Sequence, residues 1–512
     1  MPLSPVPMDA QRRQKICVLG AGPAGAACAW SLSRFPEKFE VVLVEKAPVA
    51  GGASITTQVA PDARVNDGVQ GGAPSYRNTM RLFEQVGDKA RAASDSKELF
   101  HRIQLRVAFG NGETRWSNYR VSPFIQSQRK EIKRFGKLLS LMSALEPLFL
   151  ILPIKLTMKL FGFSEQFRND VVFPLVALFF GTGNQTPNVS SAIIARVFLD
   201  PELKLFDFDD QVFLSQQPDM YAFPPLQDVY EALTKSPQIE RRTGTSVVKV
   251  SRHSHKEKPT HGATVEFKTE ATGEVYKERF DHVVMACGAD VSREVLVDMN
   301  MWERQALCNV TFFDDLIVTH TDRAYMDRMY EDALGSNEDV HYMVRSDVHD
   351  KEVIEMSFVL SNYQPQVHGR DPPIFQSIFL DAKNCASKWT RDEIDPSKVL
   401  TQRWWHQFAH TWRHFAGTVP FVRFLLRPDR ATWFCGAYTL FNTTEIAITS
   451  GLAVADQLGA PYPFEDDELA TKMFDTYCEL IMGTSRSSLK KRPLTVALWQ
   501  PIHRLARFLS GV

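Results

Sequence analysis

The stretch Lys15–Gly52, KICVLGAGPAGAACAWSLSRFPEKFEVVLVEKAPVAGG, decides the fold of the domain around it. The apolar run Ile16–Leu19 predicts a buried strand, and the run Val41–Val44 predicts a second one. The Ala-rich stretch between them is typical of a helix. Strand, helix and strand in this order indicate a βαβ unit within a doubly wound sheet.

The turn between the first strand and the helix reads Gly20-Ala21-Gly22-Pro23-Ala24-Gly25. Gly20 permits a tight turn, Gly22 lets the backbone approach a pyrophosphate, and Gly25 allows close packing of helix and strand. The helix N-terminus then faces the anion. Glu45 follows the second strand, where its carboxylate is expected to accept hydrogen bonds from ribose hydroxyls. This pattern predicts a dinucleotide site.

Four further segments favour FAD over NAD. Gly51-Gly52 is a second place where the backbone can press against the cofactor. Trp433–Ala437 predicts a buried strand that stops at a glycine, and Thr443–Ala455 predicts a helix capped by threonine. The N-terminus of that helix, aimed at the flavin N1/O2 edge, would stabilise the negative charge of the reduced ring. Asp281–Ala289 predicts a strand beside the adenosine half.

These segments resemble the flavin-containing amine oxidase and phytoene-desaturase-like superfamily of FAD oxidoreductases, most strongly at residues 15–90, 278–290 and 430–475. Within it, the chain is similar to predicted NAD/FAD-binding proteins associated with fatty-acyl modification and to flavin-dependent polyunsaturated fatty acid isomerases. The likeness extends to Val318–Asp322 and implies noncovalent FAD. The expected cofactor-binding residues are Gly20, Gly22, Pro23, Ala24, Gly25, Glu45, Lys46, Gly51, Gly52, Val248, Gly436, Glu445 and Ile446.

The predicted fold class is α/β, with a Rossmann-like FAD-binding domain of the type found in this superfamily and a mixed α/β substrate domain. The FAD-binding domain is expected from residues 1–95, 235–300 and 425–475, and the substrate domain from residues 96–234 and 301–424. Residues 476–512 are expected to form a basic amphipathic C-terminal helix.

Composition excludes some classes of partner and location. The chain has 512 residues, 44% hydrophobic and 23% charged, which fits a folded protein with more than one subdomain. The net charge of -1 gives no global reason to expect nucleic acid. Seven cysteines lack metal-ligand spacing, so buried free thiols are expected and no metal site. No apolar signal core precedes the first strand, so the expected location is cytoplasmic.

Two apolar segments leave membrane contact open. The run Leu148–Leu152 lies within a region of mixed basic and apolar residues, 130–163, and is too short to span a bilayer. It is either a buried helix or a patch that dips into lipid. The segment from Leu498 to Leu509 has one apolar helical face with basic neighbours, and it either docks on the protein or contacts a membrane surface.

Three residues are candidates for catalysis. His320 and Asp322 follow the apolar run Leu316–Val318 at the end of a predicted strand, where they could position a proton acceptor; a hydrogen-bonded strand end is the alternative. Tyr438 follows Gly436 closely and is expected on the flavin's substrate face or in ordinary core packing.

Two other segments bear on the substrate site. Ser164–Gly183 predicts an apolar helix, kinked at Pro174, most of whose residues are expected in the core. In similar proteins a helix in this place walls the substrate cavity, which the resemblance implies here as well. His406, His410 and His414 recur at helical spacing, with no acid nearby to complete a metal site.

The expected reaction is hydride transfer between flavin N5 and a small hydrophobic substrate, a fatty acyl chain or an apolar secondary metabolite, with oxidation, desaturation and isomerisation left open. Many amine oxidases of the superfamily place a lysine near N5, but residues 309–322 contain none. A flavin amine oxidase stays an alternative if Lys249 or Lys383 reaches N5. The other alternative function is that of a noncatalytic, FAD-stabilised binding protein at membranes. The oligomeric state is left open.

Overall fold

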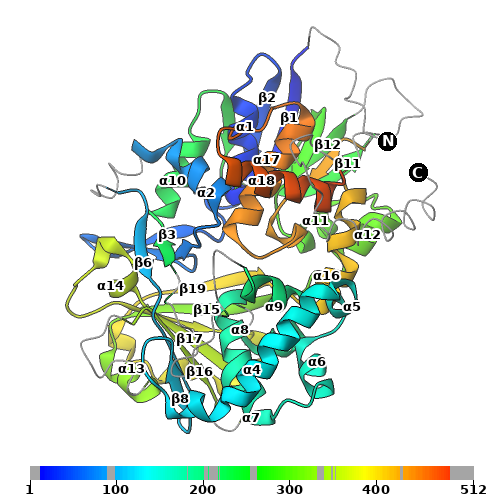
Figure 1. Cartoon of the computed structure of the whole chain (residues 1–512). Coiled ribbons are helices and arrows are strands. Elements are labelled where there is room, and N and C mark those ends of the chain that lie inside the picture. The colour runs from blue at the N-terminus through cyan, green and yellow to red at the C-terminus, as the bar shows by residue number, and fades with distance from the viewer. Residues whose placement is uncertain are drawn as a thin grey trace.

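The computed structural model describes residues 12–88, 98–181, 183–200, 206, 217, 219–253, 262–330, 340–347, 350–351, 353–426 and 430–484. It has two lobes, which Figure 1 shows one above the other. The upper lobe holds β1, β2, α1 and α17, and the lower lobe holds β15–β19 with α4, α8 and α9. This mixed α/β architecture confirms the predicted fold class.

The upper lobe is built on a five-stranded sheet in the order β10-β2-β1-β14-β20, and all of its strand pairs are parallel. The strands are β1 (Gln14–Leu19), β2 (Phe39–Val44), β10 (Ile239–Arg242), β14 (His282–Met285) and β20 (Thr432–Phe434). They come from widely separated parts of the chain. The borders of the predicted segments stay predictions, and most of the predicted C-terminal helix, from residue 485 onward, lies outside the described residues.

Both faces of this sheet are covered, which explains the continuous apolar runs in its strands. Ile16 and Val18 pack into the core on the side of α1 (Pro23–Ser33) and α17 (Thr444–Leu458). Cys17 and Leu19 pack on the opposite side, against the antiparallel strands β11 (Thr245–Arg252), β12 (Ala263–Thr269) and β13 (Val275–Phe280). All seven cysteines are free; Cys308 is exposed, Cys287 is partly buried and the other five are buried.

The lower lobe contains a seven-stranded sheet in the order β19-β15-β18-β17-β16-β7-β8. Its strands are β7 (Val107–Gly110), β8 (Arg115–Ser117), β15 (Phe312–His320), β16 (Tyr342–Ser346), β17 (Ile354–Val359), β18 (Phe375–Phe379) and β19 (Val399–Phe408). Helices α4 (Pro123–Ala144), α8 (Phe173–Phe180) and α9 (Ser191–Phe198) lie together on one side of it (Figure 1).

The predicted helix at Ser164–Gly183 is present in three parts, α7 (Glu165–Phe167), a π-helical turn (Arg168–Val172) and α8. The π turn lies just before Pro174, where the series of helical backbone hydrogen bonds is expected to be interrupted. Helix α8 ends at Gly181 in the left-handed conformation. The glycine stop is therefore confirmed, and the kink at Pro174 stays a prediction.

The remaining elements connect and flank the two lobes. The strands are β3 (Ile55–Ala60), β4 (Ala63–Asp67), β5 (Gly71–Gly72), β6 (His101–Gln104) and β9 (Asp219–Ala222). The helices are α2 (Arg77–Glu84), α5 (Glu146–Leu150), α6 (Ile154–Leu160), α10 (Leu226–Thr234), α11 (Ala289–Val295), α12 (Met301–Leu307), α13 (Arg323–Met329), α14 (Leu360–Tyr363), α15 (Ala382–Cys385), α16 (Trp412–Gly417) and α18 (Glu468–Tyr477). In the part of the chain that is described, no helix has the length and apolar character needed to cross a bilayer.

Candidate functional site

The two glycine turns meet at the carboxyl end of β1. Gly20 has a φ of 104°, and a Cβ on Gly25 would lie 1.8 Å from the carbonyl oxygen of Gly20. A Cβ on Gly52 would lie 3.0 Å from the Cα of Gly22. Main chain therefore approaches main chain where any side chain would intervene, as a pyrophosphate cradle requires.

The Glu45 carboxylate joins the first turn to the residues after β2. Its Oε2 accepts from the amide of Ala21 at 2.7 Å, and its Oε1 accepts from the amide of Ala47 at 2.9 Å. The neighbouring Lys46 is exposed. Glu45 thus fixes the turn, and each of its oxygens has a further lone pair for a ribose hydroxyl.

A cavity of about 350 Å³ opens beside the first turn and lies between the two lobes. Gly22, Pro23 and Ala24 line it from the start of α1, and Gly436 lines it from the loop after β20. A Cβ on Gly22 would meet only the Cα of Gly52, at 3.8 Å, so the space in front of the turn is open. This cradle of main chain at the carboxyl ends of parallel strands fits FAD.

The start of α17 also faces the cavity. Thr443, Thr444 and Ala447 line it, and the Thr443 side chain accepts from the amide of Ile446 at 3.2 Å. The predicted threonine cap is therefore confirmed. A flavin bound with its N1/O2 edge at this helix end would have the positive end of the helix dipole beside the negative charge of its reduced ring.

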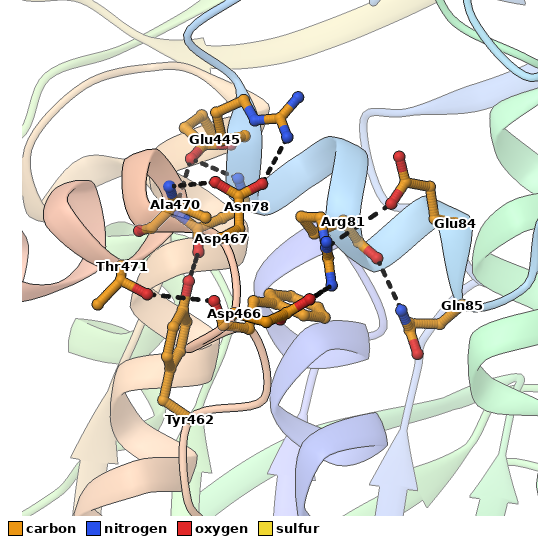
Figure 2. A network of polar contacts seen from close by, with 12 residues as sticks. Asn78, Arg81, Glu84, Gln85, Glu445, Tyr462, Asp466, Asp467, Ala470 and Thr471 are labelled. Carbon is orange, nitrogen blue, oxygen red and sulfur yellow. Dashed lines mark hydrogen bonds and ion pairs between the residues drawn. The ribbon is translucent and has the colours of Figure 1, made fainter.

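Glu445 corrects one expected cofactor contact. Its carboxylate turns toward the N-terminus of α2 and accepts from the amide of Asn78 at 3.0 Å (Figure 2). It also accepts from the amide of Thr79 at 2.8 Å. The Asn78 side-chain amide and the Thr79 hydroxyl donate to the same carboxylate. Burial raises the pKa of Glu445, and these hydrogen bonds lower it. The side chain thus joins α17 to α2, so any cofactor contact here would come from the main chain.

Val248, another expected cofactor residue, lies in the antiparallel sheet of the upper lobe. It stands in β11, at a bulge between Val247 and Lys249, and its side chain is exposed. It does not line the cavity.

His320 and Asp322 do not line the cavity. The His320 ring packs against Tyr325 and Phe375, in a core cluster separate from the one that holds the cavity-lining Phe358 and Ile378. The His320 ring is hydrogen-bonded to Ser377 at 3.0 Å, and burial lowers the pKa of His320 to about 4. Asp322 caps α13 by accepting from the Tyr325 amide at 3.2 Å. Both side chains have structural partners, and neither lies where the cofactor fits.

Tyr438 is the one catalytic candidate that lines the cavity. Its ring covers Gly436, where an added Cβ would lie 3.0 Å from two ring carbons. Burial raises the pKa of Tyr438, which keeps its hydroxyl protonated. Among the described residues that hydroxyl has no hydrogen-bond partner. The hydroxyl oxygen is itself buried, so other atoms of Tyr438 line the cavity.

The histidine triplet is not on one helix, so that prediction is wrong. His406 belongs to β19, His414 to α16, and His410 stands between them. Burial lowers the pKa of His410 to about 3 and of His414 to about 4. His410 accepts from the Asn442 amide at 2.8 Å, and His414 donates to the Tyr438 carbonyl at 2.6 Å. Both histidines therefore hold the loop after β20 in place. The helical spacing was misleading, because the chain at His406 is extended in β19.

His406 links the two lobes at the cavity wall. Its ring nitrogens are hydrogen-bonded to Asp290 at 2.9 Å and to Asp314 at 2.6 Å. The Asp290 contact is the largest cause that raises the pKa of His406, to about 9. A protonated ring can donate to both carboxylates, one from each lobe. No described group of histidine, cysteine and acidic side chains has the arrangement of a metal site.

A polar group that sequence reasoning missed lies on the substrate side. The Gln407 side chain donates to the Gly181 carbonyl at 3.1 Å and to the Asp315 carboxylate, and its oxygen accepts from Asn442 at 3.2 Å. Gln407 and Asn442 line the cavity. Burial raises the pKa of Asp315 to about 7. No local pattern marks these residues, because they come from four separate segments.

The rest of the cavity wall is largely aromatic. Its described lining includes no lysine, and Lys249 and Lys383 are exposed elsewhere. The aromatic side chains in the wall are Tyr76, Phe179, Phe180, Phe312, Tyr342, Phe358, Trp405, Phe408 and Tyr438.

Comparison with known proteins places this arrangement in a family. The sequence model of the flavin-containing amine oxidoreductases matches residues 23–459. The chain therefore belongs to the flavin-containing amine oxidoreductase family. It is an FAD-dependent oxidoreductase enzyme, as the resemblance implied.

Solved structures share the fold at low sequence identity. A conjugated-linoleic-acid (CLA)-producing fatty acid isomerase from P. acnes is 15% identical, with a TM-score of 0.58 over 86% of this chain and 98% of that one. Putrescine oxidase bound to putrescine is 12% identical, with a TM-score of 0.60 over 87% and 99%. Cyclohexylamine oxidase from Brevibacterium oxydans is 12% identical, with a TM-score of 0.56 over 87% and 100%. No curated protein sequence matches this chain significantly.

Proposed function

We propose that this chain oxidises, desaturates or isomerises a small hydrophobic substrate, a fatty acyl chain or an apolar secondary metabolite, with noncovalently bound FAD. The observation that carries the proposal is the aromatic chamber beside the glycine turns, which has no lysine among its described lining residues. Bound FAD supplies the hydride acceptance and return at N5. The residues of the chain supply binding, orientation and the exclusion of water.

The aromatic walls favour the binding of an apolar substrate, which leaves water when it enters the cavity. Phe179 and Phe180 enter from α8, Tyr342 and Phe358 from the strands of the lower sheet, and Trp405 from β19. Aromatic side chains contribute large apolar areas at a low cost in side-chain entropy. A flexible acyl chain would gain by leaving water for such a chamber.

Polar groups at one part of the wall can orient one end of the substrate. Gln407 and Asn442 line the cavity and hold each other in place by a hydrogen bond of 3.2 Å. A carboxyl or hydroxyl group of the substrate fits this position.

The rival functions have less support. An amine oxidase that uses a lysine near N5 would need one at the wall, whereas the described lining has none. A noncatalytic FAD protein would have no need of the helix end at Thr443 beside the cavity, whose dipole can stabilise negative charge on a reduced ring. The fatty acid isomerase among the structural neighbours adds support for acyl substrates.

The test is anaerobic mixing of the flavin-loaded protein with fatty acids, amines and isoprenoids, with flavin bleaching and chromatography of products as readouts. Bleaching or product formation with an acyl or isoprenoid compound is expected. Turnover of amines alone would overturn the proposal. Trp405→Ala is expected to lower kcat/KM by about tenfold or more. The matched control is Trp404→Ala, since Trp404 is exposed and does not line the cavity.

A further inference from the structure

We propose that the outer surface of α4, α5 and α6 docks on an anionic lipid bilayer. This surface, here called the apolar ledge, lies at the outer edge of the lower lobe (Figure 1). The proposal does not depend on the reaction proposed above. The ledge consists of Leu141, Leu145, Leu148, Ile151, Leu156, Leu160 and Phe161, each between 37% and 68% exposed.

The ledge is one connected surface. Leu141 and Leu145 are one helical turn apart. Leu148 follows in α5, and its amide donates to the Leu145 carbonyl at 3.0 Å. The ring of Phe149 lies 6.3 Å from that of Phe161, which brings the end of α6 beside α5. Apolar residues gathered in this way mark an interaction site more often than scattered ones do.

The fold does not need these side chains for its core. Helix α4 already buries a separate stripe of Ile132, Phe135, Leu139 and Met142. The ring of Phe135 lies 6.0 Å from that of Phe167, just before α8, so the core-facing side of α4 has its partners. The exposed leucines lie off that stripe and remain at the surface.

Charge around the ledge selects the kind of surface. Residues 123–161 contain seven Lys or Arg and two Glu, a net +5 in a chain whose total is -1. Of the two acids, Glu146 is buried and paired with Arg196, and Glu131 accepts from the Ser164 amide at 3.0 Å. Lys130, Lys137 and Lys159 are exposed. Basic residues beside exposed leucines and phenylalanine fit anionic headgroups over an acyl layer.

The helices suit insertion in the plane of the interface. Helices α5 and α6 have five and seven residues, far fewer than a span requires. The lobe that carries the ledge also carries the α8 wall of the cavity, so docking would hold the cavity close to a lipid phase.

The test is co-sedimentation of the flavin-loaded full chain with vesicles of phosphatidylcholine alone and of a 3:1 mixture with phosphatidylserine. Binding to the mixed vesicles is expected, weakened when salt rises from about 0.1 to about 0.5 M. Leu148→Ser with Leu160→Ser is expected to weaken binding about tenfold or more. Lys130→Glu with Lys137→Glu is expected to abolish the preference for phosphatidylserine.

The matched control is Val297→Ser with Met301→Ser, which changes side chains 56% and 69% exposed on the upper lobe and is expected to leave vesicle binding unchanged. Flavin content and thermal unfolding verify that each variant is folded. Three results would overturn the proposal: no vesicle binding by the wild type, equal binding by the ledge variant and the wild type, or a dimer in light scattering that the ledge variant abolishes. The first two differ from failure of the reaction, since neither measures turnover.

Discussion

The nucleotide side of the cavity and its substrate side are built in different ways. On the nucleotide side, main chain meets main chain at Gly20, Gly22, Gly25 and Gly52, with no side chain between. On the substrate side, side chains from separate segments meet, as Gln407, Asp315 and Asn442 do. A site made of backbone tolerates no added atom, whereas a site made of side chains tolerates substitution and responds to pH.

The largest expected effect is at Gly25. Gly25→Ala would place a Cβ 1.8 Å from the Gly20 carbonyl oxygen, which no rotamer change can relieve. We expect a loss of at least about 4 kcal/mol in the free energy of unfolding, or no folded protein. Urea unfolding of the purified variant measures it.

Two alanine substitutions serve as comparisons for Gly25. Gly22→Ala meets its nearest atom at 3.8 Å, so we expect a folded protein with weakened FAD affinity. Gly110→Ala, with its nearest atom at 3.6 Å and far from the glycine turns, should change neither. A stable, yellow Gly25→Ala protein would contradict the account of the backbone cradle.

The second effect tests the side-chain site through pH. The folded pKa of Asp315, about 7, is above its ordinary value of 3.8, so between these pH values the folded state holds a proton that the unfolded state has lost. Stability is therefore expected to fall as pH rises from about 4 to about 7, by up to about 4 kcal/mol. Asp315→Asn should remove this slope in urea unfolding. Asp392→Asn, at an exposed position, should keep it.

The third effect concerns the junction between α17 and α2. Glu445→Ala leaves two main-chain amides, the Asn78 side-chain amide and the Thr79 hydroxyl without their acceptor. We expect a loss of about 3 kcal/mol, measured by thermal unfolding of the protein without cofactor. Glu445→Gln should recover part of it, because one carbonyl oxygen remains. If instead FAD affinity falls while stability holds, the side chain does contact the cofactor.

The smallest expected effect is at the His406 link between the lobes. The raised pKa of about 9 means that the contribution of this link is complete below about pH 6.5 and is lost as pH rises through about 9. We therefore expect the difference in Tm between wild type and His406→Gln to be small, because the ring is half-exposed, and to vanish above pH 9. A difference that persists at pH 10 would exclude this ionic origin.

Local sequence predicted the nucleotide side well. The glycine turn, the strand runs at Ile16–Leu19 and Val41–Val44 and the Thr443 cap all follow from rules that act within a few residues. So does the helix end at Gly181 on the substrate side. Each of these features fixes either the backbone geometry or the hydrogen-bond partners of a helix end. None of them depends on a distant segment of the chain.

Residue type and spacing failed where a long-range partner decides the role. Helical spacing placed His406, His410 and His414 on one helix, but strand pairing with β15 keeps His406 extended. The residue types of His320 and Asp322 suggested a catalytic role. In the structure His320 is hydrogen-bonded to Ser377, and Asp322 caps the start of α13. The local sequence around a residue does not specify which distant residues will contact its side chain in the fold.

The sequence alone determined that this chain builds a parallel, Rossmann-like sheet and an FAD cradle, because steric limits on glycine turns and the burial of strands act locally. The second face of that sheet is covered by β11–β13 rather than by helices alone, as a doubly wound sheet would have it. The tertiary structure alone decided which side chains face the cavity: Tyr438, Gln407 and Asn442 do, whereas His320 and the Glu445 carboxylate do not. The reason is that a side chain's direction and its pKa depend on atoms brought near by folding, often from hundreds of residues away.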